Sequence, residues 1–279
     1  MSMQGKTIVV TGATSGIGEV AAVHLARQGA RIVFTARDER RAASTLAKLK
    51  QANGAAEHRA HFADLSLIAE QKRVGAQIAQ EPNIDVLINN AGALFSHRTE
   101  TREGLEKTFA LNHMSYFTLT NLLLPRLKQG ARIVSVASGA HRRGQLDVSD
   151  LQWKSRAYRG FPVYGTSKLC NILFTRALSK RLAGTGITAN CLHPGFVATR
   201  FGDQSGGWVQ KLVGVAKSLG AISQEEGAKT ILYLATSSEV ADVSGEYFYQ
   251  CRTDQPTAAA RNDADAEGLW RESAKIASF

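Results

Sequence analysis

The chain has 279 residues, of which 44% are hydrophobic, and its formal net charge is +10. No apolar run approaches the ~18 residues that a membrane-spanning helix needs, so we expect no integral membrane segment, and three widely spaced cysteines predict neither a disulfide framework nor a metal site. Aromatic residues make up only 7% of the chain and do not alternate with the basic runs, which argues against a nucleic-acid partner.

In chain order, short apolar runs alternate with segments of helical spacing. The first run lies so close to the N-terminus that it leaves no room for a secretory signal peptide, and we expect a cytoplasmic protein. Strands that alternate with helices favour a parallel sheet covered on both faces. We therefore predict an α/β protein, a single Rossmann-fold domain over residues 1–279 with a doubly wound sheet of seven parallel strands. The expected strands are Thr7–Thr11, Arg31–Ala36, His58–Ala63, Asp85–Asn89, Ala131–Ala137, Ile187–His193 and Gly245–Tyr249.

A glycine-rich segment, TGATSGIG at residues 11–18, links the first strand to a helix. Glycines let the backbone approach a pyrophosphate closely, and the N-terminus of the helix offers unpaired N–H groups to it. The position between a strand and a helix makes this pattern specific for dinucleotides. The residues that we expect to hold the cofactor phosphates are Gly12, Thr14, Ser15, Gly16, Ile17 and Gly18.

The end of the second strand indicates which dinucleotide is bound. Arg37 stands where an NAD site favours an acidic residue for the ribose 2′-hydroxyl, and a guanidinium there accommodates a 2′-phosphate instead. This position predicts NADP(H), the alternative being an exposed arginine that opens a helix. Asp64 and Leu65 follow the third strand, where we expect them beside the adenine, although Asp64 could equally cap a helix ahead of Ser66.

A tyrosine and a lysine suggest the chemistry. Tyr164 and Lys168 are four residues apart at the start of a helical segment, and this spacing puts both side chains on one helical face. An unperturbed tyrosine is a poor base at neutral pH, but an adjacent ammonium favours the phenolate and lowers the tyrosine pKa. We expect Tyr164 to exchange a proton with a carbonyl oxygen. The alternative is an exposed pair with no role.

Further polar residues fall at the carboxyl edge of the expected sheet, where ligands bind in open α/β folds. They are Asn89–Gly92, Asn112, Ser138 and Pro194–Gly195. With TGATSGIG and the YGTSK of residues 164–168, they form an ordered series. In this series the chain resembles the short-chain dehydrogenases/reductases over essentially its whole length.

The resemblance implies roles for these residues. Tyr164 would be the general acid/base, and Ser138 would bind the substrate oxygen. Lys168 would hold the nicotinamide ribose and tune Tyr164, while Asn112 would anchor a water molecule of a proton relay. The further residues that the resemblance places against the cofactor are Asn90, Ala91, Gly92, Pro194, Gly195, Val197 and Thr199.

Closer detail resembles the retinol-dehydrogenase-like branch, notably LNH at residues 111–113 and CLHPG at residues 191–195. The long separation of Ser138 from Tyr164 also fits, and it implies an insert at residues 139–163 beside the substrate mouth. Carbonyl reductases with such an insert can be monomers, so a monomer and a homodimer both stay open here. We expect no membrane anchor of the kind common in animal members, and Ser115 stands where the branch often has glycine, so we do not predict retinal as the substrate.

Three further features have a structural and a functional interpretation. We expect residues 195–222 to act as a substrate lid, because Trp208–Leu219 has an apolar stripe at helical spacing. The alternatives are a helix on a membrane surface and ordinary packing. We interpret His113 as a packing residue, and Cys191 and His193 as strand residues rather than metal ligands.

Together these features predict reversible hydride transfer between NADP(H) and an alcohol/carbonyl pair. The favoured direction is reduction of an apolar aldehyde or ketone through Ser138, Tyr164, Lys168 and Asn112. The alternative is a catalytically silent protein that binds NADP(H) as a sensor or scaffold.

Overall fold

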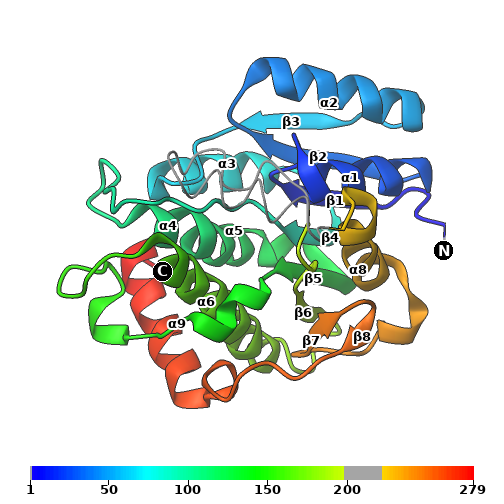
Figure 1. Cartoon of the computed structure of the whole chain (residues 1–279). Helices are drawn as coiled ribbons and strands as arrows, with labels where there is room; N and C mark the ends of the chain where they lie inside the picture. Colours follow the sequence, from blue (N-terminus) through cyan, green and yellow to red (C-terminus); the bar gives the residue numbers. More distant parts are fainter. Residues whose placement is uncertain (1, 198–221) are drawn as a thin grey trace.

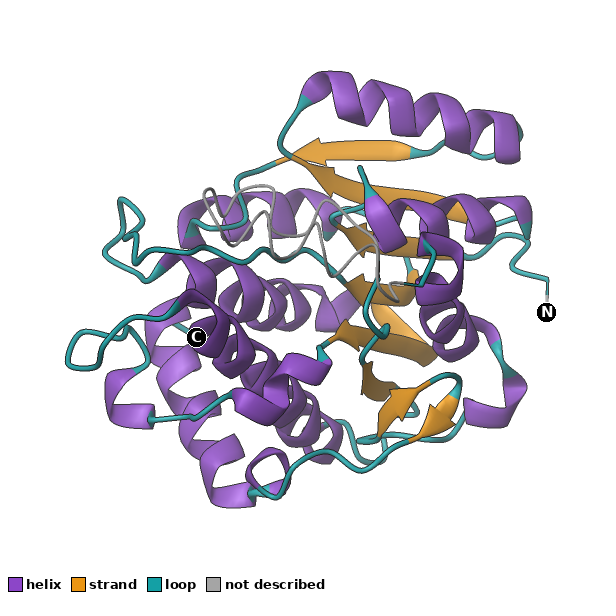
Figure 2. Ribbon diagram, in the orientation of Figure 1, coloured by secondary structure: helices purple, strands orange, loops and turns teal. Residues whose placement is uncertain are grey.

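The computed structural model describes residues 2–197 and 222–279, which form an eight-stranded sheet between layers of helices (Figures 1 and 2). The strand order is β3-β2-β1-β4-β5-β6-β7-β8, and β1 to β7 pair in parallel. The predicted parallel strands are thus confirmed with small shifts at their ends. The strands are β1 (Thr7–Thr11), β2 (Arg31–Ala36), β3 (Arg59–Phe62), β4 (Ile84–Asn89), β5 (Leu127–Val136), β6 (Thr188–Leu192), β7 (Tyr247–Tyr249) and β8 (Arg252–Thr253).

The last strand was not predicted. β8 pairs antiparallel with β7 through a two-residue turn in which both Gln250 and Cys251 have positive φ, 49° and 60°. Such hairpin turns favour asparagine or glycine at these positions. The Gln-Cys pair carries no such signal, so the short edge strand could not be recognised from its turn.

Helices cover both faces of the sheet, as Figure 2 shows. One layer contains α1 (Gly16–Arg27), α2 (Glu39–Ala52) and α8 (Gln224–Thr236), and the other contains α3 (Ile68–Ile78), the short α4 (Lys107–Phe109), α5 (Ser115–Leu123), α6 (Gly160–Arg181) and α9 (Asp263–Ala277). Successive side chains of a strand point to opposite faces. Ile8 and Val10 accordingly enter the core under α1, whereas Val9 enters the core under α6. Two apolar cores therefore fix the sheet from both sides.

The strand order indicates where a ligand would bind. It reverses between β1 and β4, and open α/β sheets bind ligands outside the carboxyl ends of the strands at such a reversal. The glycine-rich segment follows β1, and Asn90 follows β4, so both lie at this point. No helix within the described ranges is long and apolar enough to cross a membrane.

The predicted insert is partly helical. It contains two short 3-10 segments, Gly139–Arg143 and Val148–Asp150, but its last residues belong to α6, which begins at Gly160. Gly160 packs against Phe95 and Ser96 so closely that a Cβ would lie 2.5 Å from the Phe95 carbonyl oxygen. The helix that carries Tyr164 is thus anchored one turn before the tyrosine.

Candidate active site

A cavity of about 660 Å³ opens at the carboxyl ends of the strands. Its volume falls within the usual range for small-molecule and cofactor sites. Of the residues predicted from the sequence, those that line it are Gly12, Thr14, Ser15, Gly16, Ile17, Gly18, Arg37, Leu65, Asn90, Ala91, Gly92, Ser138, Tyr164, Lys168, Pro194, Gly195 and Val197. Asp64 and Asn112 are not among the described lining residues, and Thr199 lies outside the described ranges.

The glycine-rich segment forms a cradle that a larger residue would fill. Gly12 has φ +70°, and a Cβ there would lie 2.9 Å from the Cα of Ala91. The Asn90 amide braces the loop, because its Nδ2 donates to the carbonyl oxygens of Thr11 at 2.9 Å and Gly12 at 3.0 Å. Ser15 precedes α1 in an extended conformation and makes no side-chain cap. The first N–H groups of α1 therefore suit an anionic group such as a pyrophosphate.

Two arginines line the far end of the cavity, Arg37 at the end of β2 and Arg41 in α2. Asp64 makes local hydrogen bonds, and its contact with the adenine stays a prediction. Its Oδ1 accepts hydrogen bonds from the Ser66 N–H at 3.0 Å and the Ser66 hydroxyl at 2.8 Å. Burial raises the pKa of Asp64, but these bonds and the nearby charge of Arg37 outweigh that effect and hold the pKa below its ordinary value. Asp64 therefore closes a turn before α3. This role is similar to the helix cap that we gave as the alternative.

Tyr164 and Lys168 meet deep in the cavity. Tyr164 is 6% exposed, and Lys168 is 3% exposed with its Nζ 5.8 Å from the centroid of the tyrosine ring. The lysine Nζ donates to the Val136 carbonyl oxygen at 2.9 Å. This bond directs the ammonium to the end of β5, two residues before Ser138.

The prediction that Lys168 lowers the pKa of Tyr164 is wrong for the protein chain by itself. Burial raises the pKa of Tyr164 well above its ordinary value, and a hydrogen bond with the Ser138 side chain lowers it only in part. Burial also lowers the pKa of Lys168 to about 7, which weakens the positive charge that was expected to act on the phenol. At neutral pH Tyr164 is therefore a protonated phenol, suited to donate a proton.

Asn112 is not among the described residues that line the cavity, but its hydrogen bonds connect segments that do. It lies in a π-helical turn, Ala110–Met114, a feature that is frequent at functional sites. Its Nδ2 donates to the Ala93 carbonyl oxygen at 2.9 Å and to the Ser167 Oγ at 3.0 Å, while its Oδ1 accepts from the Ala93 N–H at 2.9 Å. Ser167 in turn donates to the carbonyl oxygen of Tyr164. The side chain thus joins the loop after β4 to α6, and its role in a proton relay stays a prediction.

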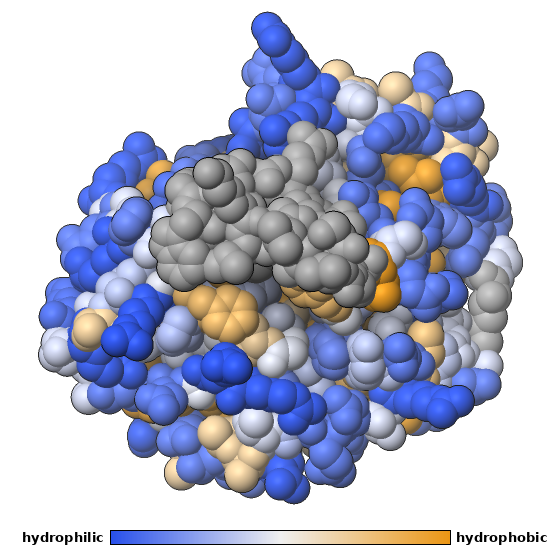
Figure 3. Space-filling view, in the orientation of Figure 1, coloured by the Kyte–Doolittle hydropathy of each residue, from blue (hydrophilic) through white to orange (hydrophobic). Residues whose placement is uncertain are grey.

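The substrate end of the cavity includes residues that the sequence did not identify, namely Leu94, Leu111, Phe161, His193, Phe196 and Tyr249. Phe161 and Phe196 are 49% and 51% exposed, although the face seen in Figure 3 is hydrophilic over most of its described surface. Tyr249 ends β7, which pairs with β6 beside His193. The parallel pairing of these strands is the signal that could have placed Tyr249 at this edge.

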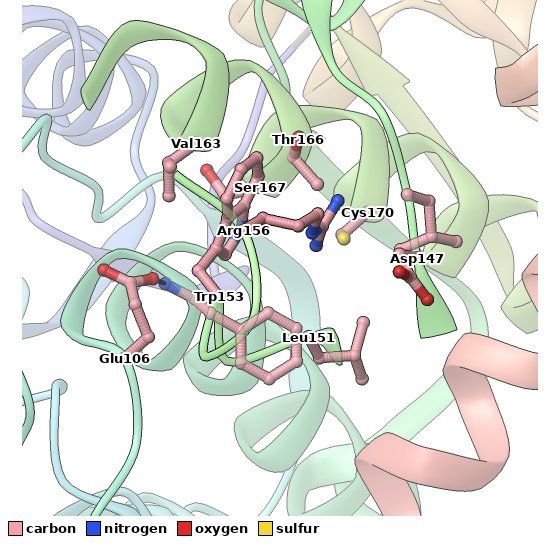
Figure 4. A pocket seen from close by; sticks show the side chains of 11 residues that line it. Glu106, Asp147, Leu151, Trp153, Arg156, Val163, Thr166, Ser167 and Cys170 are labelled. Carbon is pink, nitrogen blue, oxygen red and sulfur yellow. Dashed lines mark hydrogen bonds between the residues drawn. The ribbon is translucent and has the colours of Figure 1, made fainter. Parts of the chain in front are cut away.

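The insert packs beside this end of the cavity. The Tyr158 hydroxyl lies 3.1 Å from the buried carboxylate of Glu106, and Gln152 accepts from the Glu106 N–H at 2.7 Å. Beneath the insert, Arg156 lies 3.9 Å over the Trp153 ring beside a cavity of about 10 Å³ (Figure 4). That volume holds roughly one water molecule, so this cavity is too small for a substrate. The insert therefore packs against both α6 and the segment that precedes Asn112.

His113, which we interpreted as a packing residue, is placed accordingly, whereas His193, which we expected within a strand, follows the end of β6 and lines the cavity. His113 is fully buried, its Nε2 lies 2.8 Å from the Ser273 Oγ, and its ring lies against Phe109. Burial lowers its pKa to about 3, so the ring is neutral. Within the described ranges, no group of three or more potential ligands is arranged to hold a metal ion.

Comparison with known proteins identifies the family. The short chain dehydrogenase family matches residues 6–209. Retinol dehydrogenase 13 of Homo sapiens is 37% identical over 99% of this chain and 85% of its own length. Dehydrogenase/reductase SDR family member 13 of Bos taurus is 39% identical over 100% of this chain and 74% of its own.

Solved structures agree with this result. An uncharacterised protein from Mycobacterium paratuberculosis is 31% identical, with a TM-score of 0.81 over 100% of this chain and 95% of its own. A short chain dehydrogenase from Burkholderia cenocepacia, solved in complex with NADP, has a TM-score of 0.71 at 23% identity over 88% of this chain and 96% of its own, which shows a shared fold. The chain therefore belongs to the short-chain dehydrogenase/reductase family of oxidoreductases, and its relatives include retinol dehydrogenases.

Proposed function

We propose that this protein reduces apolar aldehydes or ketones with NADPH. The observation that carries the proposal is the protonated Tyr164 phenol, hydrogen-bonded to Ser138 and adjacent to Lys168 in a cavity whose far end holds two arginines. Bound NADPH would supply the hydride. The glycine cradle, the arginines and Lys168 are the residues that would hold it.

The protein's part in the reaction is to bind the carbonyl and deliver a proton. The Ser138 hydroxyl donates to the carbonyl oxygen and orients the substrate beside Tyr164. As the carbonyl carbon accepts the hydride, its oxygen gains negative charge, and the phenol of Tyr164 transfers its proton to that oxygen. The product is the alcohol, and the phenolate left behind is stabilised by the ammonium of Lys168.

Preference for NADPH over NADH rests on Arg37 and Arg41. A guanidinium pairs with phosphate through two parallel hydrogen bonds, which adds geometric selectivity to charge. Both arginines line the cavity beyond the glycine cradle, the end opposite Tyr164. This arrangement suits the 2′-phosphate of the adenine ribose.

The end of the cavity away from the two arginines favours an apolar substrate. Leu94, Leu111, Phe161 and Phe196 line it, and the described part of this end contributes no carboxylate to the wall. Because burial keeps His193 neutral, a substrate here would meet apolar surface and few charges. The names of the relatives favour a retinoid-like alcohol or aldehyde as one member of the test panel.

The test is to follow NADPH oxidation by the purified protein over a panel of apolar aldehydes and ketones. Turnover of at least one bulky apolar carbonyl, faster with NADPH than with NADH, is expected. Tight NADPH binding without turnover on any compound would instead support a catalytically silent sensor or scaffold.

A further inference from the structure

The imidazole of His193 lies between two turns that flank the reaction site. The residue follows β6 and lines the cavity. The Gly195 N–H donates to its Nδ1 at 3.3 Å, and the same nitrogen would lie 3.8 Å from a Cβ on Gly139, the residue after Ser138. One ring nitrogen therefore lies close to both the Ser138 turn and the Gly195 turn.

Aromatic stacking holds this ring in place. Its centroid lies 4.0 Å from that of Tyr249 at an interplanar angle of 13°, and 5.6 Å from that of Tyr247 at 23°. The Nε2 edge lies 4.0 Å from the Asp254 carboxylate, which also pairs with Arg142 at 3.5 Å. These contacts leave the ring little rotational freedom, so the direction of Nδ1 is fixed.

The ring acts as a hydrogen-bond acceptor at neutral pH. Burial lowers the pKa of His193 to about 4, and the charge of Asp254 opposes this shift only in part. A neutral imidazole has one acceptor nitrogen. Because Gly195 donates to Nδ1, the ring proton is on Nε2, the edge that faces Asp254.

The acceptor matters because the chain turns at Gly195, where the backbone is left-handed. Its φ is +86°, in the left-handed region, and it lies within the cavity wall formed by residues 194–197. No regular element covers Pro194, Gly195 or Phe196. The far end of the segment is held by the Ile222 N–H, which donates to the Phe196 carbonyl oxygen at 2.8 Å, whereas its near end, directly after β6, lies outside the sheet. The bond to His193 supplies a fixed point directly after β6.

We propose that His193 is a positioning residue, whose Nδ1 holds the Gly195 turn and thereby the wall against which the nicotinamide half of the cofactor is placed. The inference rests on the proposed function, since it takes the cofactor to be a nicotinamide dinucleotide. It assigns His193 no proton transfer and no contact with the reacting atoms. Its effect is on where the reactive half of the cofactor lies.

The experiment compares two substitutions that differ in the acceptor. His193→Asn keeps an oxygen near the position of Nδ1, whereas His193→Phe keeps an aromatic ring without any acceptor. Each variant is titrated by calorimetry with NADPH and with adenosine 2′,5′-bisphosphate, which represents the adenine half alone. His24→Phe, at a half-buried histidine of α1, is the control for loss of an imidazole elsewhere.

We expect His193→Phe to bind NADPH about tenfold more weakly, because losing the hydrogen bond of one half-buried donor shifts an equilibrium by up to roughly that factor. Its affinity for the bisphosphate should be unchanged, and His193→Asn should restore most of the NADPH affinity. Unchanged NADPH binding by His193→Phe would overturn the inference. So would equal losses for both ligands, or a His193→Asn variant as weak as His193→Phe.

Failure of the proposed function would look different. If the wild-type protein bound NADPH but reduced no carbonyl, the function would be refuted, whereas the binding pattern of the variants would still test His193. A wild-type protein that bound the bisphosphate and NADPH equally well would refute the role of the nicotinamide wall itself.

Discussion

Adding one methyl group at Gly18 should damage the cofactor cradle. A Cβ at this position would lie 2.5 Å from the Gly12 carbonyl oxygen and closer still to the Asn90 amide nitrogen. Neither neighbour can easily move. Gly12 is part of a left-handed turn, and the Asn90 amide is held by its bonds to Thr11 and Gly12.

The size of the effect follows from the contact. Forcing an extra methyl into a closely packed site usually costs about 1–3 kcal/mol of folding free energy. The strain falls on the loop expected to bind the pyrophosphate, so Gly18→Ala should also weaken NADPH binding by roughly tenfold, the change in affinity that about 1.4 kcal/mol of lost loop geometry produces.

A second helical glycine provides a matched control. A Cβ at Gly268, inside α9, would meet only the Val148 side chain, at 3.4 Å or more. Gly268→Ala should therefore gain the helix preference of alanine, about 0.5–1 kcal/mol, and leave NADPH binding unchanged.

The two variants are compared by thermal unfolding and by calorimetric titration with NADPH. We expect the unfolding midpoint to fall for Gly18→Ala and to rise by roughly 2 °C for Gly268→Ala, because ~1 kcal/mol shifts the midpoint of a domain of this size by about that amount. If Gly18→Ala bound NADPH as tightly as the wild type, the assignment of this loop as the phosphate cradle would be refuted.

Three other predictions follow from the charges of the site. Arg37→Asp should reduce the preference for NADPH over NADH by roughly tenfold or more, since it replaces a charged phosphate contact by repulsion. If the ratio of kcat/KM with NADPH to kcat/KM with NADH were the same in mutant and wild type, Arg37 would not determine the preference. Lys168→Met should abolish turnover yet raise the unfolding midpoint at pH 6 by roughly 2–4 °C, because burial of the ammonium, whose pKa is lowered to about 7, no longer costs free energy. His113 and His193, with pKa values lowered to about 3 and 4, bind fewer protons in the folded than in the unfolded protein below pH ~6.5. Their contribution to stability is therefore lost as the pH falls from ~6.5 towards 4, by roughly 1.4 kcal/mol per histidine and pH unit, and a midpoint that stayed constant between pH 7 and 5 would contradict this sign.

Much of the fold could be predicted because its pattern is local. Strands with buried faces on both sides appear as continuous Val- and Ile-rich runs, and β1 and β2 match the expected Thr7–Thr11 and Arg31–Ala36 residue for residue. β8 could not be found, because its turn at Gln250 and Cys251 lacks the usual residues. The start of α6 at Gly160 was missed because the insert before it has no distinctive pattern.

The site was predictable where residues are fixed by short motifs. Lys168 and Tyr164 meet as their spacing indicates, but the direction of the tyrosine pKa depends on burial, which no spacing reveals. Asp64 accepts hydrogen bonds from Ser66, which agrees with the helix-capping alternative that the sequence left open. His193 and Tyr249 come together only through the pairing of β6 with β7, so their stacked contact required the structure.

The most direct test of the central claim compares the wild type with Tyr164→Phe in the same two assays, NADPH binding and NADPH oxidation with an apolar aldehyde. The substitution removes only the phenolic hydroxyl, so we expect NADPH affinity close to that of the wild type and turnover reduced by roughly a thousandfold, as when a general acid is lost. A Tyr164→Phe variant that reduced the aldehyde at the wild-type rate would show that this hydroxyl does not donate the proton.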